Sequence, residues 1–416
     1  MSATSTNLLT IVIPALNEEQ AIGDTIERCL AARAGIIESG GVDGVEVIVV
    51  SDGSTDQTEN IASQYEGVQV LIFEKNRGYG AAIKCGFEHG KGSLVGFLDA
   101  DGTCDPRVFS SLCRAINEDG ADLALGSRMG PGSKMPLIRR LGNLAFALML
   151  GVLSKSKVDD SASGMRVIRR DRLVELYPLP DGLDFTPAMS ARALLEGKLK
   201  VVSIPMPYEE RQGESKLSVI RDGIRFFDSI IRTALCHRPS RPLLLTGFFM
   251  LFLSVLAGWL PMFMWMREGR FDEWLIYRIV LSAMLGTLAG LHIASAVVAE
   301  KIAALAHDRP TSSSGVTGFL MRFFGPRARG AMITGLLAVA VIVVHPGLFE
   351  YFSSGQVVMH WSRPVFSAML VLLAGILGLA GILLTIVDLV AVQRIVPLPP
   401  EPPDRIILGH ESERSG

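Results

Sequence analysis

Apolar and polar positions divide the chain into two stretches with different patterns. Between Leu8 and about Arg241, short apolar runs alternate with helical patterns and polar turns. From Pro242 to about Gln393, the apolar runs are long and nearly unbroken. Short alternating runs are typical of an α/β protein, whereas runs of about 20 apolar residues are typical of membrane-spanning helices. The pattern therefore predicts a water-soluble α/β domain followed by a membrane domain.

Five short apolar runs in the first stretch predict β-strands. They are Leu8–Pro14, Val45–Val50, Val68–Phe73, Leu94–Leu98 and Ala121–Leu125. Helical patterns follow at 21–34, from about residue 56, and at 106–118. The fourth run, 94–98, is unbroken and is followed by Gly and Pro, which predicts a strand that is buried on both faces, as in a parallel sheet.

Two carboxylates, Asp99 and Asp101, follow this fourth run directly. Open α/β sheets bind their ligands at the carboxyl ends of strands. Two neighbouring carboxylates there suit Mg2+ or Mn2+, which can also hold the phosphates of a nucleotide. Taken alone, the pair is more typical of a solvated acidic turn. Polar side chains also follow the other predicted strands, however, and the set favours a binding crevice; they include Glu18, Asp52, Arg77 and Arg128.

The composition of the chain argues against several classes of protein. The net charge of -2 argues against a nucleic-acid partner, which would need a basic excess. The five cysteines form no C-x-x-C pair, which suits a reducing compartment and excludes a zinc ribbon. The N-terminus has no basic segment and soon reaches Glu18 and Glu19, so we expect no cleavable signal and a cytoplasmic first domain.

Four apolar stretches in the second half predict a multi-pass protein of the cell (inner) membrane. They are Leu243–Met266, Ile279–Ala299, Ala331–Phe352 and Pro364–Val392, within a membrane domain at 242–393. The segment 300–329 between the second and third stretches carries more basic residues than the loops 267–274 and 353–363. The positive-inside rule therefore places both termini in the cytoplasm. His292 and Asp388 lie inside spans, and we expect both to form hydrogen bonds between helices.

The segments that flank the membrane domain have their own patterns. Residues 218–241 predict an amphipathic helix with apolar side chains at spacings of three and four, namely Ile220, Ile224, Phe227, Ile231 and Leu235. Because arginines lie between them, we expect this helix in the headgroup plane, with a core-facing helix as the alternative. The tail 394–416 is rich in proline and charge, which predicts disorder.

Four motifs, in this order and spacing, resemble the GT-A fold of family 2 inverting glycosyltransferases: PALNEE, SDGSTDQT, KNRGYGAA and LDADG. Three later segments are similar to the polyprenyl-phosphate branch, of the dolichol-phosphate mannose synthase type. These segments are GSR at 126–128, SGMR at 163–166 and RQGESK at 211–216. The resemblance covers about Leu8 to Leu217 and implies that residues 1–217 form a cytoplasmic GT-A domain.

The resemblance implies roles for individual residues. The nucleoside would be held by Pro14, Asn17, Glu18 and Asp52. Asp99 and Asp101 would bind Mg2+ or Mn2+, and the donor diphosphate or acceptor phosphate would be gripped by Arg128, Ser163, Arg211 and Lys216. Of these residues, Asp101, Arg211 and Lys216 would be catalytic. The branch usually has an apolar residue and Gln after the second Asp, whereas this chain has Gly102 and Thr103, which leaves a third metal ligand open.

The expected function is a metal-dependent transfer of a hexose from a GDP- or UDP-sugar to a polyprenyl phosphate, with inversion. Such an acceptor is already ionised near neutral pH, so it needs little help from a protein base. One alternative is a glycosyltransferase for another lipid or a polysaccharide, although the chain lacks the Gln-x-x-Arg-Trp signature of processive synthases. Another is a non-catalytic membrane scaffold that binds a nucleotide sugar. The sequence leaves the sugar, the base, the lipid length and homo-oligomerisation open.

Overall fold

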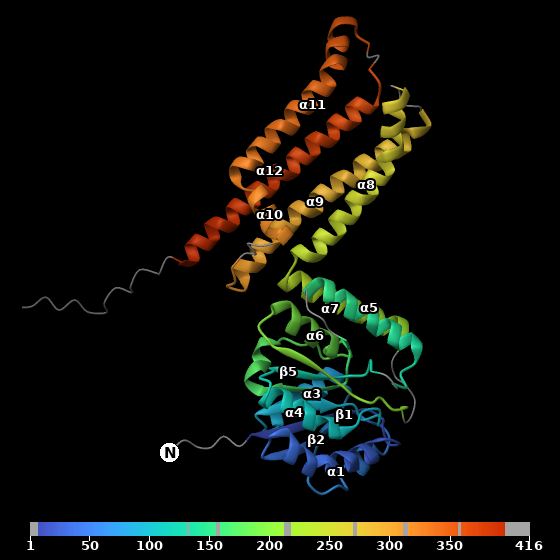
Figure 1. Ribbon diagram of the computed structural model, residues 1–416, viewed down its shortest axis with the longest axis vertical. Coiled ribbons are helices and arrows are strands. Elements are labelled where there is room, and N and C mark those ends of the chain that lie inside the picture. The colour runs from blue at the N-terminus through green and yellow to red at the C-terminus, as the bar shows by residue number, and fades with distance from the viewer. Residues whose placement is uncertain are drawn as a thin grey trace, which may run out of the picture. The chain divides into compact units, whose positions relative to one another are not determined.

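The computed structural model describes residues 7–130, 133–154, 159–211, 218–268, 273–310, 315–356 and 359–395. The chain forms two compact units, Met1–Pro242 and Leu243–Gly416. The first unit holds the sheet and its helices, and the second holds long helices (Figure 1).

The first unit is built on one seven-stranded sheet with the order β3-β2-β1-β4-β6-β5-β7. The strands are β1 Leu8–Ala15, β2 Gly44–Asp52, β3 Val68–Phe73, β4 Leu94–Leu98, β5 Leu123–Ser127, β6 Met165–Arg169 and β7 Val201–Pro205. The α-helices are α1 Ile22–Gly40, α2 Thr58–Ala62, α3 Tyr79–His89, α4 Phe109–Asn117, α5 Leu137–Ser154, α6 Phe185–Glu196 and α7 Val219–His237. Two short 3-10 helices lie at Pro106–Val108 and Arg170–Glu175. The predicted α/β class is confirmed.

The five strands predicted from apolar runs are present, but the sheet around β4 is mixed. β4 pairs in parallel with β1 and antiparallel with β6. The expectation of a parallel neighbourhood on both sides of β4 was therefore wrong. The reason is that the chain, after β5 and α5, returns through the sheet in the opposite direction as β6, between β4 and β5. All five residues of β4 are buried, as predicted.

Helices cover both faces of the sheet and fix the position of β4. On one face, α1 and α4 pack against the sheet through side chains such as Ile26 and Leu112. On the other face, Phe97 of β4 contacts Phe87 of α3 and Phe185 of α6 with ring centroids 6.3 and 5.9 Å apart. Full burial of one such ring contributes about 1.5–3 kcal/mol. The carboxyl end of β4 is thus held firmly at the sheet edge where β1 and β2 also end.

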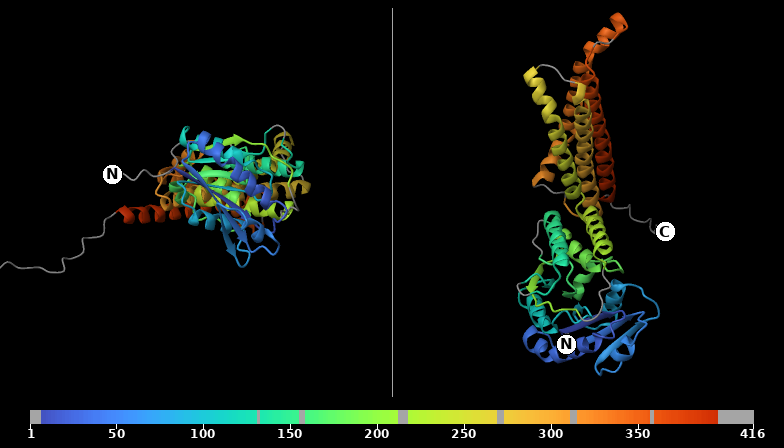
Figure 2. Two further views of the ribbon diagram at one scale, coloured as in Figure 1. Left: turned by 90° about the horizontal axis from the view of Figure 1, so that it is seen from below. Right: turned by 90° about the vertical axis from the view of Figure 1, so that its right-hand side faces the viewer.

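The second unit consists mainly of four long helices, α8 Ser240–Glu268, α9 Ile276–Ala306, α11 Pro326–Ser354 and α12 Ser362–Ile395. A 3-10 helix at Glu273–Leu275 and the short helix α10 Gly315–Phe323 lie between them. In Figure 2 the long helices run alongside one another. Within the described residues, five helices are long and apolar enough to cross a membrane: these four regions and α5 of the first unit, which the sequence reasoning did not predict.

Charged and polar side chains in the second unit form local contacts. Asp388 of α12 accepts from Lys301 of α9, with Nζ 2.5 Å from Oδ1, so it links two helices as expected. The ring nitrogen Nδ1 of His292 lies 2.9 Å from the carbonyl oxygen of Leu288 in its own helix, rather than bonding to a neighbouring helix as expected. Of the predicted disordered tail, residues 396–416 lie outside the described residues.

Candidate active site

A cavity of about 580 Å³ opens at the carboxyl edge of β1, β2 and β4. One end of it is polar and contains the carboxylates of Glu18, Asp52, Asp99 and Asp101. The other end lies between α5 and α7 and is lined by apolar side chains together with arginines and other polar side chains. The cavity therefore joins an acidic site to a groove of mixed apolar and basic character within the first unit.

Asp99 and Asp101 lie in the turn that follows β4. The hydroxyl of Tyr79 donates to Oδ1 of Asp99 at 2.6 Å, and the hydroxyl of Thr103 donates to Oδ1 of Asp101 at 2.7 Å. Burial, together with the charge of Asp101, raises the pKa of Asp99 to about 7. Two carboxylates this close repel each other, so the pair favours a bound cation.

Arg211 supplies a positive charge between the acidic groups. Its Nη1 lies 3.1 Å from Oδ2 of Asp101, and its Nη2 lies 2.8 Å from Oε1 of Glu18. All three side chains are less than a fifth exposed. The guanidinium thus bridges two carboxylates where a divalent cation would also be attracted. The sequence prediction that Arg211 belongs to the site fits this position.

Three of the four residues expected to hold a nucleoside line the cavity, namely Pro14, Glu18 and Asp52. Asp52 ends β2, and its Oδ1 accepts from the backbone N–H of Arg77 at 2.6 Å. Asn17 does not line the cavity. Its Oδ1 accepts from the backbone N–H of Thr55 at 2.7 Å, so it links the turn after β1 to the turn after β2. The expected contact of Asn17 with the nucleoside stays a prediction, and the structure gives this side chain a role in linking the two turns.

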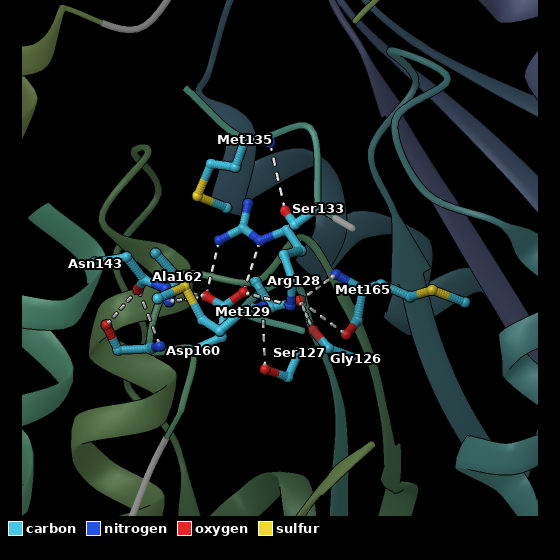
Figure 3. Close-up of polar contacts among 12 residues, drawn as sticks. Gly126, Ser127, Arg128, Met129, Ser133, Met135, Asn143, Asp160, Ala162 and Met165 are labelled. Atoms are coloured by element: carbon cyan, nitrogen blue, oxygen red, sulfur yellow. Dashed lines mark hydrogen bonds and ion pairs between the residues drawn. The ribbon is translucent and has the colours of Figure 1, made fainter. Parts of the chain in front are cut away.

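Arg128 follows β5 and forms a buried ion pair with Asp160 (Figure 3). Nε and Nη2 of Arg128 donate to the two carboxylate oxygens at 2.7 and 2.8 Å. Asn143 of α5 also donates to this carboxylate, at 2.9 Å. Burial alone would raise the pKa of Asp160, but Arg128 holds it below the ordinary value of 3.8. Sequence reasoning missed Asp160, because nothing in its local pattern distinguishes it from a solvated acid.

The pairing with Asp160 leaves part of the Arg128 guanidinium for a ligand. Arg128 lines the cavity, and its side chain lies over the ring of Tyr208, with 5.7 Å from Cζ to the ring centroid. Among the residues that the structure describes, none accepts a hydrogen bond from its Nη1. The predicted role in gripping a phosphate is therefore compatible with the geometry.

Ser163 does not lie where it could grip a phosphate. It is fully buried, and its hydroxyl donates to the carbonyl oxygen of Gly126 at 2.5 Å. The hydroxyl therefore ties the start of β6 to β5, and this position does not favour the expected binding role, which stays a prediction. Lys216, expected in the same phosphate group, lies outside the described residues.

The apolar end of the cavity is formed by α5 and α7, which lie side by side (Figure 1). The rings of Phe146 and Phe226 meet there with centroids 6.1 Å apart. Basic side chains of both helices line the same space, including Arg139, Arg221 and Arg225. An apolar groove with cationic side chains suits a lipid that carries an anionic head.

The outer surfaces of α5 and α7 are apolar and exposed. On α5 the exposed side chains are Leu137, Ile138, Leu141, Leu144, Leu148 and Val152. On α7 they are Val219, Ile220, Ile224, Phe227 and Leu235, which include four of the five positions expected on the apolar face. This exposure does not fit the core-facing alternative for the amphipathic helix. A patch of this kind marks an interaction surface.

The donor set fits a hard divalent cation. The oxygens of Asp99 and Asp101 are of the type that Mg2+ and Mn2+ prefer. A Cβ atom on Gly164 would lie 1.8 Å from Oδ2 of Asp99, so a side chain there would displace the carboxylate. Arg211 already places a cationic group against Asp101. The residues present are therefore compatible with the cation that the sequence predicts.

Comparisons with known proteins agree with this geometry. Residues 10–176 match the model of the Glycosyl transferase family 2. The chain is 32% identical over 234 residues to a dolichyl-phosphate hexose transferase of Haloferax volcanii, covering 55% of this chain and 95% of that protein. It is 33% identical over 253 residues to the low-salt glycan biosynthesis hexosyltransferase Agl6 of the same organism, covering 60% of this chain but only 58% of that protein.

Part of the chain is also similar to solved structures. Glucosyl-3-phosphoglycerate synthase of Mycobacterium tuberculosis, solved with Mn2+, UDP-glucose and phosphoglyceric acid, is 22% identical, with a TM-score of 0.43. The match covers 55% of this chain and 80% of that one.

Proposed function

The chain belongs to glycosyl transferase family 2, whose polyprenyl-phosphate branch it resembles, and we propose that it moves a hexose from a nucleotide-diphosphate sugar to a polyprenyl phosphate. The observation that carries this proposal is the single cavity that joins Asp99 and Asp101 to the groove between α5 and α7. One end suits a nucleotide diphosphate with a cation, and the other suits a lipid. The relative named dolichyl-phosphate hexose transferase supports the same acceptor class.

The donor occupies the polar end in this proposal. Asp99 and Asp101 would hold Mg2+ or Mn2+, and such a cation would supply positive charge for the departing nucleoside diphosphate. Pro14, Glu18 and Asp52 border the space for the nucleoside. Arg128 offers Nη1 to the diphosphate, while its other nitrogens remain on Asp160. The hexose then lies between the diphosphate and the groove.

The acceptor phosphate occupies the basic part of the groove. An oxygen of this phosphate attacks the anomeric carbon, and the bond from that carbon to the β-phosphate oxygen of the donor breaks. The bonding electrons leave with the nucleoside diphosphate, and no proton has to be moved because the acceptor is already ionised. An in-line displacement inverts the anomeric centre.

The protein's contribution is positioning and charge neutralisation, because two anionic reactants repel each other. Arg211 lies beside Asp101 and Glu18 in the cavity, and with Lys216 of the same segment it is proposed to close on the phosphates. For that, Arg211 has to leave Asp101 when a cation binds. The carboxylate would then exchange one cationic partner for another.

The apolar outer faces of α5 and α7 are proposed to lie in the headgroup layer of the membrane. The first unit would then be cytoplasmic at the inner face of the cell membrane, with the domain limits predicted above, and the helices from 242 to 393 would anchor it. A prenyl chain could enter the groove from the bilayer while its phosphate remains near the arginines.

The test uses the purified full-length protein in detergent, with labelled UDP- and GDP-hexoses, Mn2+ and a polyprenyl phosphate. We expect one sugar nucleotide to raise the melting temperature, because a ligand that binds only the native state stabilises it. The same donor should label the lipid. Binding of a donor without any transfer would contradict the proposal and favour the non-catalytic scaffold.

A further inference from the structure

Each aspartate of the candidate metal site has one carboxylate oxygen held by a hydroxyl group. Tyr79 donates to Oδ1 of Asp99 at 2.6 Å, and Thr103 donates to Oδ1 of Asp101 at 2.7 Å. The backbone N–H of Thr103 also points at Oδ1 of Asp101, at 3.2 Å. Distances of 2.6–2.7 Å are those of strong hydrogen bonds to an ionised acceptor.

The ring of Tyr79 is fixed on two sides, so its hydroxyl has little freedom. Its backbone begins α3, directly after Gly78, whose N–H donates to Oδ2 of Asp52 at 3.0 Å. Its ring packs edge-on against Phe97 of β4 with centroids 6.5 Å apart. The same strand, β4, carries Asp99 at its end. The donor and the acceptor of this hydrogen bond are therefore held by one packed unit.

The second oxygen of each aspartate is the one that remains for a cation. In the described part of the chain, no donor bonds to Oδ2 of Asp99, which lies against the backbone of Gly164. Oδ2 of Asp101 faces Nη1 of Arg211 at 3.1 Å. Neither Oδ2 atom is bound by a hydroxyl group, and Oδ2 of Asp101 already attracts a positive group, the guanidinium of Arg211.

We propose that Tyr79 and Thr103 are positioning residues that orient Asp99 and Asp101, so that the Oδ2 atom of each is offered to the divalent cation. This inference rests on the proposed function, since it presumes a cation at these two aspartates. It also explains Thr103, which replaces the Gln expected as a third ligand. Thr103 is 1% exposed and donates its hydroxyl to Asp101, so it supports a ligand.

Removal of either hydroxyl group should lower the affinity of the site for the cation without abolishing binding. Groups that orient a metal ligand typically contribute a factor of about 10 to 100 in metal affinity. Tyr79→Phe keeps the ring on Phe97 and removes only the bond to Asp99. Thr103→Val removes the bond to Asp101, and Thr103→Ser restores it, so this second pair tests the inference even if Tyr79→Phe fails to fold.

The experiment measures Mn2+ binding by electron paramagnetic resonance of free Mn2+, with the full-length protein in detergent and no sugar nucleotide. We expect about tenfold weaker binding for Tyr79→Phe and Thr103→Val, and wild-type binding for Thr103→Ser. Tyr65→Phe is the matched control, because it removes a tyrosine bond to a carboxylate, Glu27, outside the cavity, at 2.9 Å. It should bind Mn2+ as the wild type does.

The outcomes separate the inference from the function on which it rests. Equal Mn2+ affinity of wild type, Tyr79→Phe and Thr103→Val would overturn the positioning role and leave the proposed transferase intact. Wild-type protein without Mn2+ binding would overturn both. In turnover, the two variants should need about tenfold more Mn2+ for half-maximal rate, while the rate at saturating Mn2+ changes much less.

Discussion

Arg128, which lines the candidate site, forms a deeply buried ion pair with Asp160, with side chains 13% and 0% exposed. Asp160 also accepts from Asn143 of α5 and from the backbone of Arg128 itself. The pair therefore connects the strand edge to α5, the helix that borders the apolar groove. Removing one partner of such a buried ion pair destabilises the folded protein, because the other charge stays buried without a counter-charge.

Asp160→Asn should destabilise the first unit strongly. The variant leaves the buried Arg128 without a counter-charge, and broken buried pairs typically cost about 3–5 kcal/mol. Asp171→Asn is the control, since Asp171 pairs with Arg169 at the surface with both side chains about half exposed or more. Its cost should stay below about 1 kcal/mol. Thermal unfolding in detergent measures both, and equal melting temperatures would contradict the account.

The contribution of Asp160 also has a predictable dependence on pH. Its pKa lies below the ordinary 3.8 in the folded protein, so the unfolded chain binds the proton more readily. The stabilisation is therefore complete above the unfolded pKa and is lost as the pH falls through the folded pKa. The difference in stability between wild type and Asp160→Asn should be constant near neutral pH and shrink only in acid below about pH 4.

Asp101→Asn should abolish metal-dependent transfer and leave the fold intact. The amide oxygen of Asn can still accept from Thr103, so the local turn is kept. The negative charge that attracts the cation is lost. Turnover across an Mn2+ titration, with circular dichroism as the check on folding, measures this. Wild-type turnover from the variant would remove Asp101 from the metal site.

At the level of single residues, the sequence predicted acidic groups at strand ends but not the direction of every side chain. Asp52, Asp99 and Asp101 do meet in one cavity, because the strands that carry them end at one edge. Ser163 faces the interior, where it bonds to Gly126, a contact 37 residues away in sequence. Tyr79 was passed over because its partner Asp99 is 20 residues distant. Such pairings depend on how strands are ordered in the sheet.

Among the helices and strands, α5 differs most from what the sequence predicted. The sequence from Leu137 to Ser154 is apolar enough to cross a membrane, yet it belongs to the first unit and packs against α6 and α7. Its inward side chains include Leu150 and Leu153, while its outward side chains are also apolar. Because both faces are apolar, periodicity alone does not reveal a surface helix here.

The position of α5 at a membrane surface can be measured with nitroxide labels. Leu148→Cys and Val174→Cys place the label at side chains that are 68% and 75% exposed, the first on α5 and the second in the 3-10 helix 170–175. Cys85 and Cys236, the two cysteines that are not buried, are first replaced by serine. In nanodiscs we expect the Leu148 label to be accessible to oxygen and the Val174 label to a water-soluble nickel reagent. If the labels at positions 148 and 174 were equally accessible to the nickel reagent, a membrane-facing α5 would be contradicted.

The strands and long helices were largely predictable, whereas the order of the sheet was not. Apolar runs located β1 to β5 because buried strands need a continuous apolar segment. The antiparallel insertion of β6 depends on a return of the chain after α5, which no local pattern encodes. That insertion is nevertheless important for the site, since it brings Gly164 against Asp99.

On the scale of the whole molecule, the chain combines a glycosyltransferase fold with long apolar helices. The soluble donor and the lipid acceptor that we propose would need such a combination, because one reactant comes from water and the other from the bilayer. The cavity of the first unit contains surfaces of both kinds. The two-part organisation was predictable from hydropathy because the apolar stretches of the second half are so long.

The most direct test compares two acceptors that differ only in the phosphate. Full-length protein in detergent receives the labelled sugar nucleotide that stabilises it, Mn2+, and either a polyprenyl phosphate or the corresponding polyprenol, with Asp101→Asn as the control. We predict labelled sugar in the lipid extract with the phosphate only, and none with Asp101→Asn or after chelation of the metal. Equal labelling of the polyprenol, or no labelling of the polyprenyl phosphate with any stabilising donor, would contradict the account.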